Sequence, residues 1–210
     1  MKTKFTKRIL ASLIGVILIS IAVAIFRYCD IGTDPFSCFN LGICNITGLS
    51  FGNVQVLVSI ILFLGLYFVG KQFFGIGTLM SMFLVGYISD FLLSIIPIEA
   101  ATIPMYARYL ILVVGLVTTS FGISLYSSAN LGVSAYDAMS FILVDRYNHL
   151  HLQYTRILVD ILLVVGGFFM GSVVGIGTLI IAFGVGPCVA YFLKKVTGPY
   201  IFPENEIDTE

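Results

Sequence analysis

Long apolar runs dominate the chain and are separated by short polar breaks. Six runs are long enough to cross about 30 Å of hydrocarbon as helices; they cover residues 9–28, 53–70, 74–96, 107–127, 154–170 and 173–193. Two further stretches, 31–49 and 131–148, are half apolar and carry several polar residues. An Asp near the bilayer centre costs about 2.5–3.5 kcal/mol on the insertion scale. These two stretches are therefore predicted to be re-entrant half-helices.

The whole pattern occurs twice, at a constant offset of 100 residues. Gly32 aligns with Gly132, and the Gly-Ile-Gly-Thr-Leu segment at 75–79 is identical to 175–179. A tandem repeat of this size in an apolar chain is typical of transporter-like folds, whose sites form where the two copies meet near the bilayer midplane. The predicted organisation is one membrane domain with a first repeat (1–100), a second repeat (101–198) and a polar C-terminal tail (199–210), which is expected to be disordered from Pro203 to Glu210.

The number of crossings in each repeat decides their relative orientation. If the half-apolar stretches do not cross, each repeat crosses three times, and the second copy inserts upside down. The expected fold is then an all-α integral membrane protein with six transmembrane helices in two inverted three-helix repeats, each with a re-entrant half-helix. An N-terminus in the cytoplasm puts nine Lys and Arg inside and only Arg27 and Arg108 outside. An eight-span arrangement gives the same nine to two, so charge alone leaves both open, and the polar content of the two stretches favours six.

Composition places the protein in a membrane. Hydrophobic residues make up 59% of the chain and charged residues 10%, which is too little charge to cover a soluble surface. The net charge is zero and no basic tract occurs, so a nucleic-acid partner is not expected. The first apolar run is longer than the apolar core of a typical signal peptide, and we interpret it as a retained helix, with both termini cytoplasmic.

Polar residues recur at the start of the two half-helices. Asp34-Pro35-Phe36-Ser37 aligns with Ser134-Ala135-Tyr136-Asp137, and a further polar residue follows three positions later in each copy, near the same helical face. The candidate ligand- or ion-binding residues are Asp34, Ser37, Asn40, Ser134, Asp137 and Ser140.

Helix capping is the alternative interpretation of these residues. Asp34 before Pro35 is a typical N-cap, and Ser134 with Asp137 forms a capping box. Capping does not exclude a site, because a half-helix N-terminus inside a bundle presents a positive dipole end that binds anions or a substrate carboxylate. Neighbouring Asp residues can bind protons or cations instead.

Further polar positions are candidates for coupling or gating. Asp90 has no obvious partner on its own helix, and an unpaired intramembrane carboxylate either faces water or holds a proton. Asp160 follows Arg156 by four residues, which predicts an ion pair between them. Asn53 aligns with Gln153 at the start of the second span of each copy, where either interfacial hydrogen bonding or a gate is expected.

The Gly-Ile-Gly-Thr segments are predicted to be packing sites. Glycines let two helices approach closely, and the Thr hydroxyl can bond across the contact, so we expect the helices at 74–96 and 173–193 to meet there. His149 and His151 have no Cys or carboxylate cluster near them, and no Ser-His-Asp or Cys-His set is evident. We therefore expect no metal, no cofactor and no enzymatic activity.

These features together resemble the YczE branch of the YczE/YitT families of bacterial multi-spanning membrane proteins. The resemblance rests on Gly32-Thr33-Asp34-Pro35, on the segment Thr-Gly-Leu-Ser-Phe-Gly at 47–52, and on both Gly-Ile-Gly-Thr segments. Such proteins usually show Gly-Pro-Arg-Asp where this chain has Ser-Ala-Tyr-Asp at 134–137, so Asp137 alone is carried over. The resemblance implies a multi-pass protein of the bacterial inner membrane and supplies no substrate.

We therefore expect a small-molecule or ion transporter whose site lies between the repeats at the half-helix N-termini. The alternative is a non-transporting membrane scaffold or accessory protein. The expected partners are the lipid bilayer and a small-molecule or ion ligand, and the small size of the bundle also suggests a homodimer.

Overall fold

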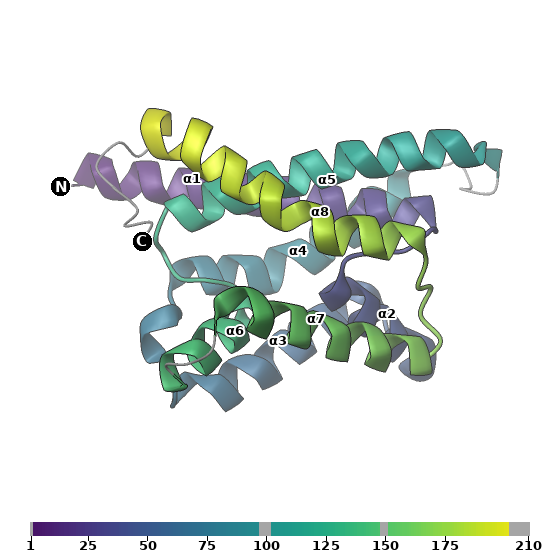
Figure 1. The fold of residues 1–210 in the computed structure, drawn as a ribbon, viewed down its shortest axis with the longest axis horizontal. Coiled ribbons are helices and arrows are strands. Elements are labelled where there is room, and N and C mark those ends of the chain that lie inside the picture. Colours follow the sequence, from purple (N-terminus) through teal and green to yellow (C-terminus); the bar gives the residue numbers. More distant parts are fainter. Residues whose placement is uncertain (1, 97–101, 148–150, 202–210) are drawn as a thin grey trace.

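The protein is all-α, as Figure 1 shows. This computed structural model describes residues 2–96, 102–147 and 151–201. The helices are α1 (Lys2–Cys29), α2 (Pro35–Thr47), α3 (Phe51–Tyr67), α4 (Ile76–Ile95), α5 (Met105–Ser128), α6 (Ala135–Arg146), α7 (Leu152–Phe169) and α8 (Ile176–Phe192), with a 3₁₀ turn η1 (Lys71–Phe73) and a π-helical end η3 (Leu193–Ile201).

The helices follow the predicted pattern closely. Each of the six predicted spans coincides with a helix, and α2 and α6 lie in the two half-apolar stretches. The predicted boundary between the repeats and the segment predicted to be disordered, Pro203 to Glu210, lie outside the described residues.

Four helices are long and apolar enough to cross a bilayer: α1, α4, α5, and α8 with its extension to Gly198. A helix of about 20 residues spans the hydrocarbon core. The short α2 and α3 bend by 114° at the break between them, and together they form a fifth broken span or a re-entrant loop. Among the described residues there are thus four to five candidate spans, which makes the protein a multi-pass membrane protein in contact with the lipid bilayer.

The helices form two layers, and each layer takes helices from both repeats. One layer contains α1, α4, α5 and α8, and the other contains α2, α3, α6 and α7 (Figure 1). The chain runs along α1 away from the N-terminus and returns along α5, so these equivalent helices are antiparallel neighbours (Figure 1). Packing between α3 and α4 connects the layers.

Each half-helix packs against the other repeat. Helix α2 lies along α7, and α6 lies along α3. The approach of α2 to α7 depends on glycine: a Cβ added to Gly167 would lie 2.8 Å from the Cys38 sulfur, and one added to Gly42 would lie 2.8 Å from the Met170 Cβ. The polar half-helix α2 is therefore covered by protein along one face, which satisfies the condition for polar backbone at membrane depth.

The Gly-Ile-Gly-Thr segments also join the repeats, but not as predicted. The Gly77 N–H donates to the Leu131 carbonyl at 2.9 Å, and the Thr78 hydroxyl donates to the Val133 carbonyl at 2.6 Å. In the second copy the Gly177 N–H donates to the Ile31 carbonyl at 3.0 Å. Helices α4 and α8 are therefore not paired with each other. Each begins against the loop that leads into the other copy's half-helix. The loop carbonyls need hydrogen-bond donors, and the free N–H groups in the first turn of a helix supply them.

Candidate functional site

The start of α2 is fixed by Asp34. Its backbone is extended (φ −63°, ψ 155°), its Oδ1 accepts the Ser37 N–H at 3.0 Å, and Pro35 occupies the first helical position. The capping interpretation of Asp34 is therefore correct. The second carboxylate oxygen, Oδ2, is buried and has no hydrogen-bond partner among the described residues. Capping thus accounts for one oxygen of Asp34 and leaves the other unexplained.

The start of α6 is fixed in the same way, with the roles exchanged. The Asp137 N–H donates to the Ser134 hydroxyl oxygen at 3.1 Å, and that hydroxyl donates to Asp137 Oδ2 at 2.8 Å. The two residues therefore bind each other, and the carboxylate of Asp137 lies in the first turn of α6.

The two half-helices meet at their N-termini. The rings of Phe36 and Tyr136, which occupy equivalent positions in the two copies, stack with centroids 5.2 Å apart and planes 11° apart. Stacked aromatic pairs at this separation are favourable beyond the area that they bury. This contact places the first turn of α2 beside the first turn of α6.

Helix α7 adds two charges to this junction. Arg156 Nη2 lies 3.1 Å from Asp137 Oδ1, and the Arg156 guanidinium lies 5.9 Å from the Tyr136 ring centroid. The Tyr136 hydroxyl donates to Asp160. The predicted pair of Arg156 with Asp160 is therefore wrong. Asp137 on α6 takes the guanidinium, and Asp160 is satisfied by a tyrosine that the sequence analysis did not single out.

The remaining predicted residues of the half-helices are buried. Asn40 is fully buried, and its Nδ2 donates to Gln55 Oε1 of α3 at 2.6 Å, which leaves Asn40 Oδ1 without a donor. Ser37 and Ser140 are also buried. Buried polar atoms without partners are rare in folded proteins, so Asn40 Oδ1 calls for an explanation.

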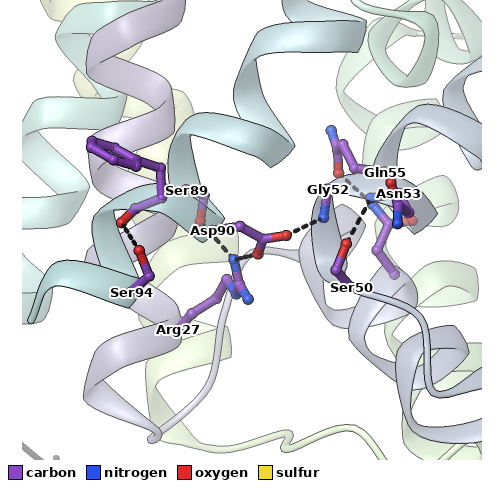
Figure 2. A network of polar contacts seen from close by, with 10 residues as sticks. Arg27, Ser50, Gly52, Asn53, Gln55, Ser89, Asp90 and Ser94 are labelled. Atoms are coloured by element: carbon purple, nitrogen blue, oxygen red, sulfur yellow. Dashed lines mark hydrogen bonds and ion pairs between the residues drawn. The ribbon is translucent and has the colours of Figure 1, made fainter.

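Asp90 lies apart from the junction, and it has a partner. Arg27 Nη1 is 2.8 Å from Asp90 Oδ1 and also donates to the Ser89 hydroxyl, while Asp90 Oδ2 accepts the Gly52 N–H at 2.7 Å (Figure 2). Asp90 thus forms an ion pair with Arg27 of α1 and also accepts a hydrogen bond from the first turn of α3. The expectation of an unpaired carboxylate is wrong because the partner comes from another helix of the same repeat.

The predicted polar pair at the start of α3 and α7 is described only in part. The Tyr87 hydroxyl donates to Asn53 Oδ1 at 3.0 Å, a hydrogen bond between α4 and α3 within the first repeat. Gln153 lies in α7, and its side chain is outside the described residues. A pocket of about 360 Å³ occurs elsewhere, between residues 72–76 and 127–133.

The comparison of the two copies contained a signal for the residues that were missed. Arg27 and Asp90 align with Ser127 and Ala190, so both charges are absent from the second copy together. Tyr136, Arg156 and Asp160 align likewise with Phe36, Val56 and Ile60. Residues that contact each other in one copy are thus replaced together in the other copy. Such paired replacements indicate which residues are partners.

Comparisons with known proteins agree with the sequence-based resemblance. A model for a family of unknown function, DUF6198, matches residues 6–194. An uncharacterized protein of Haemophilus influenzae is 27% identical over 79% of this chain and 74% of its own length. The uncharacterized membrane protein YczE of Bacillus subtilis is 23% identical over 79% of this chain and 75% of its own length. The uncharacterized protein YyaS of the same organism is 24% identical over 80% of this chain and 83% of its own length. No solved structure matches significantly.

Proposed function

The chain belongs to the DUF6198 family of bacterial multi-pass membrane proteins, and from that premise we propose that it transports a small molecule or an ion. The site in this proposal lies between the repeats, where α2 and α6 begin. The candidate residues are Asp34, Ser37, Asn40, Ser134, Asp137 and Ser140, together with the α7 groups Arg156 and Asp160.

The contact of the two half-helix N-termini carries the proposal. The stack of Phe36 on Tyr136 joins one half-helix from each repeat at 5.2 Å. Transporters with internal repeats place substrate and coupling ions at this kind of junction, because discontinuous helices expose polar backbone and dipole ends inside the bundle. Ionisable residues inside a membrane are costly, and they mark pathways more often than packing contacts.

The proposed topology has six spans and two inverted repeats. Its support is the antiparallel course of α1 and α5, together with the sharp bend of α2 against α3 (Figure 1). Helices α3 and α7 then cross the membrane, whereas α2 and α6 enter and return on the side from which they came. The two N-termini of the half-helices would lie at the same depth, accessible in turn from the two sides.

Transport is tested with purified protein in liposomes on a solid-supported membrane. Concentration jumps of sodium chloride, potassium chloride, ammonium chloride, choline chloride, sodium glutamate and sodium phosphate are applied, and charge movement is recorded. We expect a current for at least one solute, and we expect Asp34→Asn and Asp137→Asn to abolish it while remaining folded. Ser94→Ala, an exposed hydroxyl on α4, is the matched control and keeps the current.

Two outcomes would count against transport. If the wild-type protein gives no current with any of these solutes, the scaffold or accessory role is favoured. If both Asp variants fail to fold, capping and pairing explain these residues, and the proposal loses its main support.

A further inference from the structure

The two halves of the half-helix junction differ in how their carboxyl groups are compensated. In the second copy, Asp137 pairs with Arg156, and Asp160 accepts the Tyr136 hydroxyl. In the first copy, Asp34 has no ion pair among the described residues, and its Oδ2 is buried without a donor. The residues of α3 that align with Arg156 and Asp160 are Val56 and Ile60, which carry no charge. Asp34 is therefore left with neither a counter-charge nor a donor for its second oxygen.

The sum of charges at the junction is negative. Asp34, Asp137 and Asp160 supply three carboxyl groups, against the single guanidinium of Arg156. An isolated carboxylate in a low-dielectric interior is strongly unfavourable, so it must gain a proton or a cation.

Two unsatisfied buried atoms, one on the cap of α2 and one within α2, are also of one kind. Asp34 Oδ2 and Asn40 Oδ1 are buried oxygens that accept hydrogen bonds and cannot donate them. Asn40 is fully buried, so water at the protein surface does not reach it. Each of these oxygens can be satisfied only by a hydrogen-bond donor or a positive charge. An anion without a proton to donate brings neither.

The positive ends of the half-helices do not offset this charge for an incoming anion. One N–H group in the first turn of each half-helix already has an acceptor within the chain: Asp34 accepts the Ser37 N–H, and Ser134 accepts the Asp137 N–H. An anion at either N-terminus would also meet the carboxylate of Asp34 or Asp137. Anion binding at these helix N-termini is therefore disfavoured.

We propose that Asp34 is the group that contacts the ligand and that this ligand is a single positive charge, either a proton or a monovalent cation. This inference rests on the proposed function, because it names the chemical class that the same site accepts. Asp137 is paired with Arg156, and Asp160 accepts a hydrogen bond from Tyr136. Asp34 has no ion pair among the described residues and one oxygen without a donor, so it is the carboxyl group whose charge the ligand balances.

The test separates the charge of Asp34 from its cap. Asn is as good an N-cap as Asp, so Asp34→Asn keeps the hydrogen bond to the Ser37 N–H and removes only the charge. Asp34→Ala removes both. Ser50→Ala is the matched control, because Ser50 caps α3 through the Asn53 N–H and lies outside the site. We expect Ser50→Ala to lower the free energy of unfolding and to keep the stabilisation by the cation or the protonated-carboxyl band.

Two measurements on purified protein in detergent complete the experiment. Thermal unfolding is followed by tyrosine fluorescence, since the chain has 11 Tyr and no Trp, while lithium, sodium, potassium or ammonium chloride replaces tetrapropylammonium chloride at constant ionic strength. Infrared spectra over a pH series detect a protonated carboxyl group. We expect either saturable stabilisation by one of these cations or a protonated-carboxyl band, and we expect Asp34→Asn to lose whichever effect the wild type shows.

Three outcomes would overturn the inference: stabilisation by phosphate or glutamate with the cation held constant, a cation effect or carboxyl band that persists in Asp34→Asn, or absence of both effects in the wild type. The outcome is independent of transport. Cation or proton binding without current in liposomes would refute the transport proposal and leave the role of Asp34 standing.

Discussion

Arg27 and Asp90 form an ion pair that joins several elements of the first repeat. The guanidinium lies 4.1 Å from the Phe51 ring centroid and binds both Asp90 and Ser89, so a single side chain holds α1, α3 and α4 together (Figure 2). Arg is suited to this role because its planar group stacks on a ring and donates several hydrogen bonds at once.

Removing one partner of this pair should destabilise the protein strongly. We expect Arg27→Met to lower the free energy of unfolding by about 2–4 kcal/mol, because it leaves Asp90 largely buried without a cation. The double variant Arg27→Met/Asp90→Asn should recover part of that loss. Thermal unfolding of the two single variants and the double variant gives the coupling energy. Additive effects would show that the pair contributes no coupling.

At the scale of single residues, the polar positions were predictable and many of their partners were not. The caps of α2 and α6 follow from Asp34-Pro35 and from Ser134 with Asp137, because capping depends on neighbours in the sequence. The pairs of Asp137 with Arg156 and of Asp90 with Arg27 join residues on different helices. Spacing along one helix gave the wrong partner for Arg156, since a guanidinium reaches an adjacent helix as easily as the next turn.

Among the structural elements, the loops before the half-helices are closely packed. Gly32 has φ +119° and Gly132 has φ +101°, a backbone region that L side chains rarely adopt. A Cβ on Gly32 would also lie 2.6 Å from the Thr178 N, and one on Gly132 would lie 2.5 Å from the Gly75 N. These loops thus combine unusual backbone with backbone-to-backbone packing between the repeats.

Alanine at these positions is therefore expected to be harmful. Gly32→Ala and Gly132→Ala should each lower the free energy of unfolding by more than about 1 kcal/mol, since the backbone cannot adopt the native φ without strain. Gly186→Ala is the matched control, because a Cβ there meets no described atom within 4 Å. The melting temperatures of the three variants check this. Equal melting temperatures would mean that the loops adapt.

The helices themselves were more predictable than their packing. Apolar runs and polar breaks place all eight helices, because burial in lipid and in protein selects the same residues. The predicted contact of α4 with α8 does not occur. Glycine and threonine at the start of a helix can pack against a loop and donate hydrogen bonds to its carbonyls as well as pack against another helix. The glycines and threonine predict that the start of each helix makes a close contact. They do not predict which segment of the chain it contacts.

For the molecule as a whole, six and eight spans differ at one pair of equivalent positions. Lys71 follows α3 and Gly171 follows α7, at the offset of 100 residues. With six spans and inverted repeats, these positions lie on opposite sides of the membrane. With eight spans they lie on the same side.

Cysteine labelling in intact cells distinguishes these topologies. The four native cysteines, Cys29, Cys38, Cys44 and Cys188, are free and are first replaced. We expect Val173→Cys, in the same exposed loop as Gly171, to react with an impermeant maleimide from outside, and Lys71→Cys to react only after the membrane is opened. Reaction of both from outside would refute six spans and the inversion of the repeats.

Each half-helix packs against a helix of the other repeat, and this has a consequence for synthesis of the chain. Helix α2 is covered by α7, whose contact residue Gly167 follows Gly42 by more than 100 residues. At about 5–20 residues per second, the ribosome needs on the order of ten seconds to supply that cover. During this interval the polar half-helix has no protein partner from the second repeat. We therefore expect the first repeat to complete its folding only when the second has entered the membrane.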